Sequence, residues 1–132
     1  MPTAAGVEWR EEAPAGAVRE RRFTLWRDAR PIPGLLWTPL EGSGPWPLVL
    51  LGHGGSGSKD EGYVVTIARG LATTHRVAAA AIDGPVHGDR RKDPDATSIL
   101  VIAQFAQLWA SDGEAMTETM VADWRAVLSA LL

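Results

Sequence analysis

The stretch that decides the fold of this chain is PLVLLGHGGSGSKDE, Pro47–Glu61. Its apolar run, Leu48–Leu51, is typical of a strand buried on both faces of a parallel sheet. The run ends at a His-Gly-Gly turn, and Ser58 with Glu61 three residues later matches a capping box at the start of a helix. A buried strand that ends in a glycine-rich turn directs several backbone N–H groups at one point. Such a nest binds a phosphate or stabilises an oxyanion during acyl transfer.

The residues that follow complete a strand-helix-strand unit. Apolar residues at helical spacing predict a helix over Lys59–Thr74, and the apolar run Val77–Ile82 predicts a second buried strand. Two strands joined by a helix lie parallel in one sheet, so we expect a parallel core. We also expect the Val77–Ile82 strand to carry an uncovered edge, because the pattern contains no further strand after it.

The segments before this unit predict an arm and a hairpin. Residues 1–17 are rich in Ala, Gly, Pro and Glu and predict a flexible arm. Val18–Trp26 alternates in polarity and predicts an edge strand, and Ile32–Trp37 predicts a second strand that nearby prolines keep peripheral. We therefore expect an antiparallel hairpin at the amino-terminal side of a single domain that covers residues 18–132.

Two helices are predicted after the second buried strand. Thr97–Trp109 is apolar nearly all round, and Ser111 with Glu114 matches a second capping box, followed by a long helix with one apolar face. The expected fold class is α/β: a mostly parallel sheet with an antiparallel amino-terminal hairpin and flanking helices.

Composition excludes several classes of function. The chain has 132 residues and a formal net charge of −3, so there is no electrostatic case for binding nucleic acid. It has no cysteine, which excludes disulfides, thiolate metal sites and a cysteine nucleophile within it. The apolar runs are too short to span a bilayer, and the first residues lack an apolar signal core. We expect a cytoplasmic protein without a membrane or nucleic-acid partner.

The phosphate interpretation of the glycine turn is disfavoured by its lysine. Gly52 and Gly57 have the separation of a phosphate-loop motif, but Ser58 intervenes before Lys59. Asp60 then stands where the motif places a magnesium-binding hydroxyl, so the lysine is out of register and an acid follows it.

Other chemistries at the same stretch are also weak. Ser56 lies in a near match to the Gly-x-Ser-x-Gly elbow, but the fifth residue is Ser, and His53 is too close in sequence to act as its base. His87 and Asp89 are one conceivable metal pair, yet the histidines show no metal-ligand spacing. Asp83 ends a buried strand and so lies in the plane where active sites form. We predict no metal and no cofactor.

Taken in order, these stretches resemble the α/β-hydrolase superfamily. Pro47–Glu61 resembles its third strand, oxyanion turn and first helix, and VAAAAIDGPVHGDR, Val77–Arg90, resembles its fourth strand and Asp-x-Pro-x-His-Gly-x-Arg turn. Met116–Leu132 resembles the helix that leads into the nucleophile strand. The likeness covers Val18–Leu132 and is nearest to dienelactone-hydrolase-like and acyl-peptidase-like members.

This resemblance implies an ester or related acyl hydrolase that uses a Ser or Cys nucleophile. It assigns the oxyanion-loop backbone to Gly54 and Gly55, with the Gly55 N–H as the favoured donor, and loop positioning to His53; it makes Asp83 and His87 turn residues. The alternative is a purely structural role for these glycines, in a tight turn that needs positive φ. The pattern ends before the nucleophile elbow, so nucleophile, acid and base do not map onto this chain, and the chain alone is expected to be inactive.

Two other classes stay open. The chain is a non-catalytic half-domain that pairs with itself or with a complementing second half, or it is a nucleotide-binding domain. If it is the hydrolase portion, its expected partner is a small ester or acyl substrate.

Overall fold

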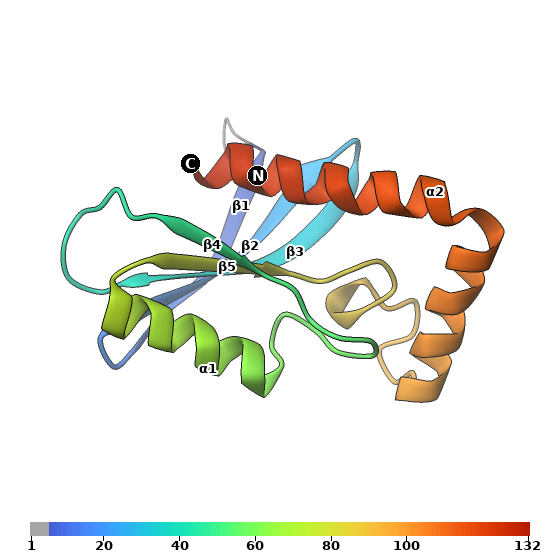
Figure 1. Ribbon diagram of the computed structural model, residues 1–132, viewed down its shortest axis with the longest axis horizontal. Helices are drawn as coiled ribbons and strands as arrows, with labels where there is room; N and C mark the ends of the chain where they lie inside the picture. The colour runs from blue at the N-terminus through green and yellow to red at the C-terminus, as the bar shows by residue number, and fades with distance from the viewer. Residues whose placement is uncertain (1–5) are drawn as a thin grey trace.

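The computed structural model describes residues 6–132 and contains five strands and two long helices. The elements are β1 (Val7–Ala15), β2 (Val18–Arg27), β3 (Arg30–Pro39), β4 (Leu48–Leu51), α1 (Gly62–Gly70), a π-helical turn (Leu71–His75), β5 (Ala78–Ile82), a 3-10 turn (Gly88–Arg90) and α2 (Ser98–Leu131). The strands form one sheet in the order β1-β2-β3-β5-β4 (Figure 1).

The sheet is mixed, and the prediction of a mostly parallel sheet is wrong. The β1–β2, β2–β3 and β3–β5 pairings are antiparallel, and only β4–β5 is parallel. The physical reason lies in the connections: tight turns join β1, β2 and β3 and reverse the chain each time, whereas the helix-containing connection between β4 and β5 lets the second strand run in the same direction.

The amino-terminal segment was predicted as an arm, and this is wrong for Val7–Ala15, which form β1. The first five residues lie outside the described part of the chain. Because β1 pairs with β2, the Val18–Trp26 segment is an interior strand and not an edge strand. The hairpin of β2 and β3 is confirmed as antiparallel.

The third strand is also interior, although prolines predicted a peripheral place. Its pairing with β5 is limited to the four positions from Gly34 to Trp37. Pro31, Pro33 and Pro39 lie outside that segment, so their missing N–H groups do not interrupt the β3–β5 ladder.

Flanking helices cover opposite faces of the sheet, as predicted (Figure 1). On β5, Ala78, Ala80 and Ile82 belong to the apolar cluster that contains Val127 of α2. The alternate residues Ala79 and Ala81 belong to the cluster that contains the buried side of α1. Alanine has a low propensity for strands. In β5, however, both faces are covered, so burial decides the structure of this segment.

The two edge strands of the sheet are β1 and β4, so the prediction of an uncovered edge on Val77–Ile82 is wrong, because β5 lies between β3 and β4. Within residues 6–132, β4 pairs only with β5, and all four of its residues are only half-buried. The parallel unit therefore lies at one end of the sheet, and the outer edge of β4 has no strand partner within residues 6–132.

Both predicted capping boxes are absent. Helix α1 begins at Gly62, three residues later than Lys59, because Ser58 Oγ accepts the nearby Asp60 N–H and no side chain caps the helix. Helix α2 is continuous through Ser111 but has a kink at Asp112 (φ −163°, ψ 80°). There the Asp112 carboxylate, not Ser111, accepts the N–H of Ala115.

No helix within residues 6–132 has the length and the apolar character needed to cross a bilayer.

Candidate active site

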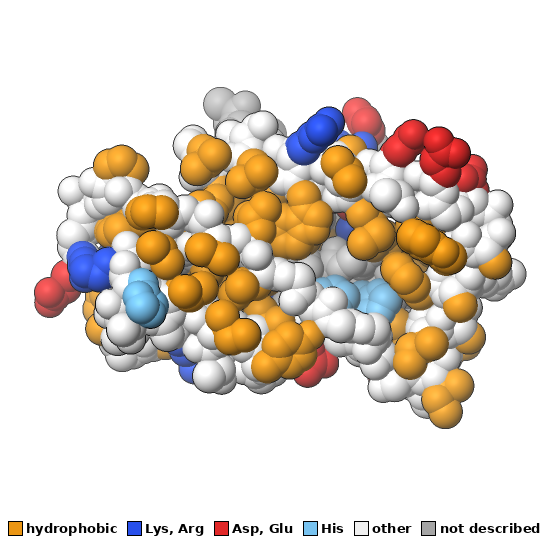
Figure 2. All heavy atoms as spheres, in the orientation of Figure 1, with side chains coloured by type: hydrophobic (Ala, Val, Ile, Leu, Met, Phe, Trp, Pro, Cys, Tyr) orange, Lys and Arg blue, Asp and Glu red, His pale blue; other side chains and the backbone are white. Residues whose placement is uncertain are grey.

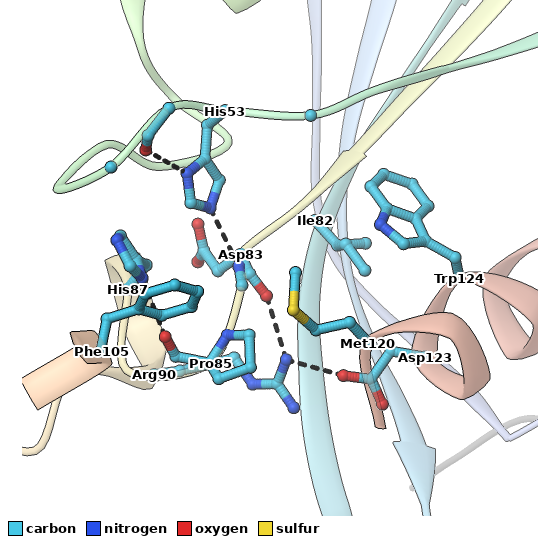
Figure 3. Close-up of a pocket in the computed structure, with 14 residues that line it drawn as sticks. His53, Ile82, Asp83, Pro85, His87, Arg90, Phe105, Met120, Asp123 and Trp124 are labelled. Carbon is cyan, nitrogen blue, oxygen red and sulfur yellow. Dashed lines mark hydrogen bonds and ion pairs between the residues drawn. The ribbon is translucent and has the colours of Figure 1, made fainter. Parts of the chain in front are cut away.

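A pocket of about 160 Å³ lies at the carboxyl ends of β4 and β5 (Figure 3). One side is the β4 loop, which we define as residues 52–61, and another is the β5 turn, residues 83–91. Apolar side chains of α2, including Phe105, Met120 and Trp124, close the remaining side. The predicted residues His53, Gly54 and Gly55 all line this pocket.

The two predicted oxyanion-loop glycines differ in their hydrogen bonds. The Gly54 N–H donates to the hydroxyl of Tyr63 on α1 at 2.6 Å. The Gly55 N–H has no hydrogen-bond partner within residues 6–132. Neither glycine has a positive φ; in this loop the positive φ belongs to Ser56, at 61°. The purely structural alternative, a turn that needs positive φ at these glycines, is therefore wrong.

His53 links the β4 loop to the β5 turn. Its Nε2 accepts the Gly84 N–H at 2.9 Å, and its Nδ1 lies 2.8 Å from the carbonyl oxygen of Gly54. An amide N–H needs a lone pair to donate to, so the proton of the ring is on Nδ1 and the imidazole is neutral.

His87 lies beside His53, although the two are far apart in sequence. Their ring centroids are 5.0 Å apart. His87 Nε2 accepts the main-chain N–H of Ser56 at 3.0 Å, and its Nδ1 lies 2.8 Å from the Pro85 carbonyl. Because His87 bonds the amide and not the hydroxyl of Ser56, the pair is not arranged for nucleophilic attack.

A buried ion pair holds the β4 loop against the β5 turn. Lys59 is 2% exposed and Asp83 is 0% exposed. Lys59 Nζ lies 2.7 Å from Asp83 Oδ2 and 2.9 Å from Asp89 Oδ2, and the main-chain N–H groups of Lys59 and Asp89 also donate to Asp83. Burial lowers the pKa of Lys59, but the charges and hydrogen bonds of Asp83 and Asp89 outweigh it and raise that pKa above its ordinary value.

This arrangement argues against the phosphate and metal interpretations. Lys59 is committed to carboxylates and is not free to bind a phosphate. Both carboxylate oxygens of Asp83 are occupied, so it acts as a turn residue. Within residues 6–132 no group of three or more His, Asp or Glu side chains is arranged to hold a metal ion.

A second buried carboxylate connects α2 to the floor of the pocket. Asp123 is 2% exposed and accepts from Arg90 at 3.0 Å and from Arg27 at 2.8 Å, while Arg90 also donates to the Asp83 carbonyl. Sequence reasoning missed this residue. Asp123 follows Met116 by seven residues, which puts an acid on the apolar face of the helix, and that irregularity is the signal that identifies it.

No protein-family model and no curated protein matches the chain. Solved structures do match. A cold-adapted esterase from an Arctic intertidal metagenomic library, in a PEG-bound complex, is 36% identical with a TM-score of 0.72, over 92% of this chain and 48% of that protein. Its native structure gives 31% identity and a TM-score of 0.63, over 92% and 46%. A candidate acetyl xylan esterase from Bacteroides fragilis NCTC 9343 is 15% identical with a TM-score of 0.56, over 76% and 30%, and shows the fold alone.

These likenesses confirm the hydrolase-type fold expected from the sequence. The chain spans about half the length of the Arctic esterase that it matches.

Proposed function

We propose that this chain forms the amino-terminal portion of an α/β-hydrolase that cleaves esters, and that Gly55 donates one hydrogen bond to the oxyanion. The observation that carries the proposal is that Gly55 lines the pocket and its N–H has no hydrogen-bond partner within residues 6–132. The 36% identity to an esterase gives this amide a chemical context.

The surroundings of Gly55 suit an oxyanion donor. Its neighbours are held on both sides, since Tyr63 and His53 bind Gly54 and His87 binds Ser56. A donor fixed before the reaction costs no reorganisation when negative charge develops. A methyl group built on Gly55 would meet no atom within 4 Å, so the space beside this residue is open to a substrate.

The reaction follows from this placement. A base takes the proton of a hydroxyl or thiol nucleophile as it adds to the ester carbonyl carbon, the carbonyl electron pair moves to oxygen, and the Gly55 N–H stabilises that oxyanion. When the tetrahedral adduct collapses, the carbonyl re-forms, the bond to the leaving oxygen breaks, and the protonated base gives its proton to that oxygen to release the alcohol. Water then adds to the remaining acyl group in the same way, and the acid is released with the nucleophile regenerated. The chain has no Gly-x-Ser-x-Gly, so nucleophile, acid and base come from outside it. The substrate is a small ester or acyl compound, and the likeness to dienelactone-hydrolase-like and acyl-peptidase-like members belongs to the same proposal.

A non-catalytic half-domain is the second candidate, and the open edge of β4 favours it. Exposed apolar residues in the first half of α2 form a separate uncovered surface, among them Ile99 and Trp109, which are 81% and 53% exposed. Figure 2 shows apolar side chains on this face of the molecule. Under this candidate the chain pairs with a second copy or with a complementing second half and has no part in catalysis.

The experiment joins residues 1–132 to the carboxyl-terminal half of the Arctic esterase and measures hydrolysis of p-nitrophenyl acetate. We expect hydrolysis by the chimera and none by the chain alone. Gly55→Pro removes the N–H and is expected to lower kcat by about 10²–10³-fold. Gly55→Ala keeps the N–H and is the matched control, expected to retain most of the activity.

Two outcomes would contradict the proposal. One is an unchanged kcat in a folded Gly55→Pro chimera, with folding checked by its melting temperature. The other is a chimera that is folded and hydrolyses no ester.

A further inference from the structure

Two histidines join the β4 loop and the β5 turn, and each accepts a hydrogen bond from the segment that contains the other. His53, from the β4 loop, accepts the N–H of Gly84 in the β5 turn. His87, from the β5 turn, accepts the N–H of Ser56 in the β4 loop. Figure 3 shows the two rings on the side of the pocket opposite Met120 and Trp124, with dashed lines marking the hydrogen bonds of His53.

All four ring nitrogens are engaged, and this fixes the protonation of both rings. Each Nε2 accepts an amide N–H, so it carries no proton. Each Nδ1 lies 2.8 Å from a carbonyl oxygen, that of Gly54 for His53 and that of Pro85 for His87, and donates to it. Both imidazoles are therefore neutral and have the proton on Nδ1.

We propose that His53 and His87 form a reciprocal brace that positions the Gly55 amide, with His87 as a positioning residue that the sequence did not reveal. The brace holds the residues on both sides of Gly55: His53 binds the Gly54 carbonyl, and His87 binds the Ser56 amide. Its effect on catalysis rests on the proposed function of Gly55, whereas the geometry of the two rings does not.

The backbone at Ser56 shows why this amide needs a partner. Ser56 has a φ of 61°, a left-handed conformation that is unfavourable for a residue other than glycine. The hydrogen bond from its N–H to His87 offsets part of that cost. Without it, we expect the residue to return to an ordinary conformation and to carry the adjacent Gly55 with it.

The surroundings of the rings favour their neutral state. His87 is 3% exposed, and the ring of Phe105 packs against it edge-on with centroids 5.3 Å apart. The charged groups that line the same pocket are already paired: Asp83 with Lys59, and Arg90 with Asp123. A proton on either Nε2 would remove an acceptor and place a charge 5.0 Å from the other ring, so the brace requires both Nε2 atoms to be unprotonated.

The direct test is nitrogen NMR of the histidine rings in the 132-residue chain at about pH 8, where an ordinary histidine is neutral. We expect His53 and His87 to show a protonated Nδ1 and an unprotonated Nε2, and the exposed His75 to show the averaged signals of a free ring. An Nε2-protonated or averaged signal from His53 or His87 would overturn the brace.

Paired variants separate positioning from simple packing. Glutamine presents an oxygen near the place of Nε2 and accepts a hydrogen bond, whereas leucine fills space without one. We expect His87→Leu to speed hydrogen exchange of the Ser56 amide, and His87→Gln to preserve its protection, with Ala80 of β5 unchanged in both. Equal exchange at Ser56 in the two variants would contradict the role of His87.

Activity of the chimera then tests the consequence for catalysis. We expect His87→Leu to lower kcat about 10–10²-fold more than it changes KM, and His87→Gln to restore most of the loss. An unchanged kcat in His87→Leu would overturn the positioning role. A chimera without any ester hydrolysis would instead contradict the proposed function, and the brace would then be tested by the NMR measurement of the two rings.

Discussion

The β4 loop and the β5 turn meet at the same end of the sheet but are built differently. The β4 loop contains four glycines, is largely exposed or half-buried, and is held by hydrogen bonds to its backbone. The β5 turn is fixed by the buried carboxylate of Asp83, and Arg90 ties it to α2. Under the proposed function, the β4 loop offers an amide to a ligand, whereas the β5 turn supports that loop.

A site that uses a backbone donor has two requirements, access for the substrate and a fixed position of the donor, and here different segments meet them. A backbone donor must be reachable by a substrate, so it cannot be buried under side chains. Its position must nevertheless be fixed, and the fixed element is the neighbouring turn. Lys59 is the last anchor of the β4 loop and connects the two, because its Nζ and its main-chain N–H both bind Asp83.

The largest effect is expected from removing that anchor. Lys59→Met leaves the buried Asp83 carboxylate without its cation, and we expect a loss of about 3–5 kcal/mol in the free energy of unfolding. The matched control is Lys92→Met, the other lysine of the chain, which is exposed and should change stability by less than about 0.5 kcal/mol. Equal losses in denaturant titrations of the two variants would contradict the support role of the ion pair.

The same ion pair gives a pH dependence with a definite sign. The folded-state pKa of Lys59 is raised, so its contribution to stability is complete below the ordinary lysine pKa and is lost as pH rises through the folded value. Alkaline unfolding of the wild type should therefore approach that of Lys59→Met at high pH.

A glycine pair tests the difference between the two loops directly. Gly88, in the β5 turn, has a φ of 54°, and a methyl group there would lie 2.2 Å from the Asp83 carboxyl. Gly88→Ala is expected to cost about 2–3 kcal/mol. Gly55→Ala, in the β4 loop, should change the free energy of unfolding by less than about 0.5 kcal/mol. Melting curves of both variants measure this, and a smaller loss for Gly88→Ala than for Gly55→Ala would reverse the comparison.

A smaller effect is expected from Tyr63→Phe. It removes the hydroxyl that accepts the Gly54 N–H, and the loss should be about 0.5–1.5 kcal/mol, because one neutral hydrogen bond to an accessible loop is lost. Hydrogen exchange should speed up at Gly54 and remain unchanged at Asp89, whose amide binds Asp83 in the other loop. Faster exchange at both positions would mean that the two loops open as one unit.

The smallest effect belongs to the exposed end of the β4 loop. Burial raises the pKa of Asp60, but the hydrogen bond from Arg22 and the charge of Lys59 outweigh it and lower that pKa. Its stabilisation is present above the ordinary aspartate pKa and is lost as pH falls through the lowered folded value. Asp60→Asn should cost less than about 1 kcal/mol at neutral pH, since the carboxylate is exposed, and nothing in strong acid. A loss that persists in strong acid would show that charge is not its cause.

Several elements were predicted correctly because their cause is local. The run Leu48–Leu51 and the run Val77–Ile82 are strands, and α1 lies between them as the helical spacing indicated. The break near Ser111 was also predicted, but the structure puts the cap one residue later, at Asp112. A serine and an aspartate next to each other are both good caps, and only the backbone geometry decides between them.

Other elements could not be predicted from local pattern. The strand character of β1 depends on its pairing with β2, since its sequence, rich in charges and with one proline, shows weak alternation. The site was found only in part: Gly54, Gly55 and His53 were named, whereas Lys59 was judged by a phosphate motif that its buried partner excludes. Asp123 and His87 gained importance only when α2 and the β5 turn were seen to line one pocket.

The sequence by itself determined the strand-helix-strand unit and its glycine turn, because apolar runs, helical spacing and glycine act over a few neighbouring residues. The tertiary structure decided the rest. It puts β4 and not β5 at an edge of the sheet, it lets His53 and His87 each accept an amide N–H from the other's segment, and it pairs Lys59 with a carboxylate. These features join residues about 24–31 positions apart in the chain. Only the fold brings such residues together, and burial then makes their hydrogen bonds and charges obligatory.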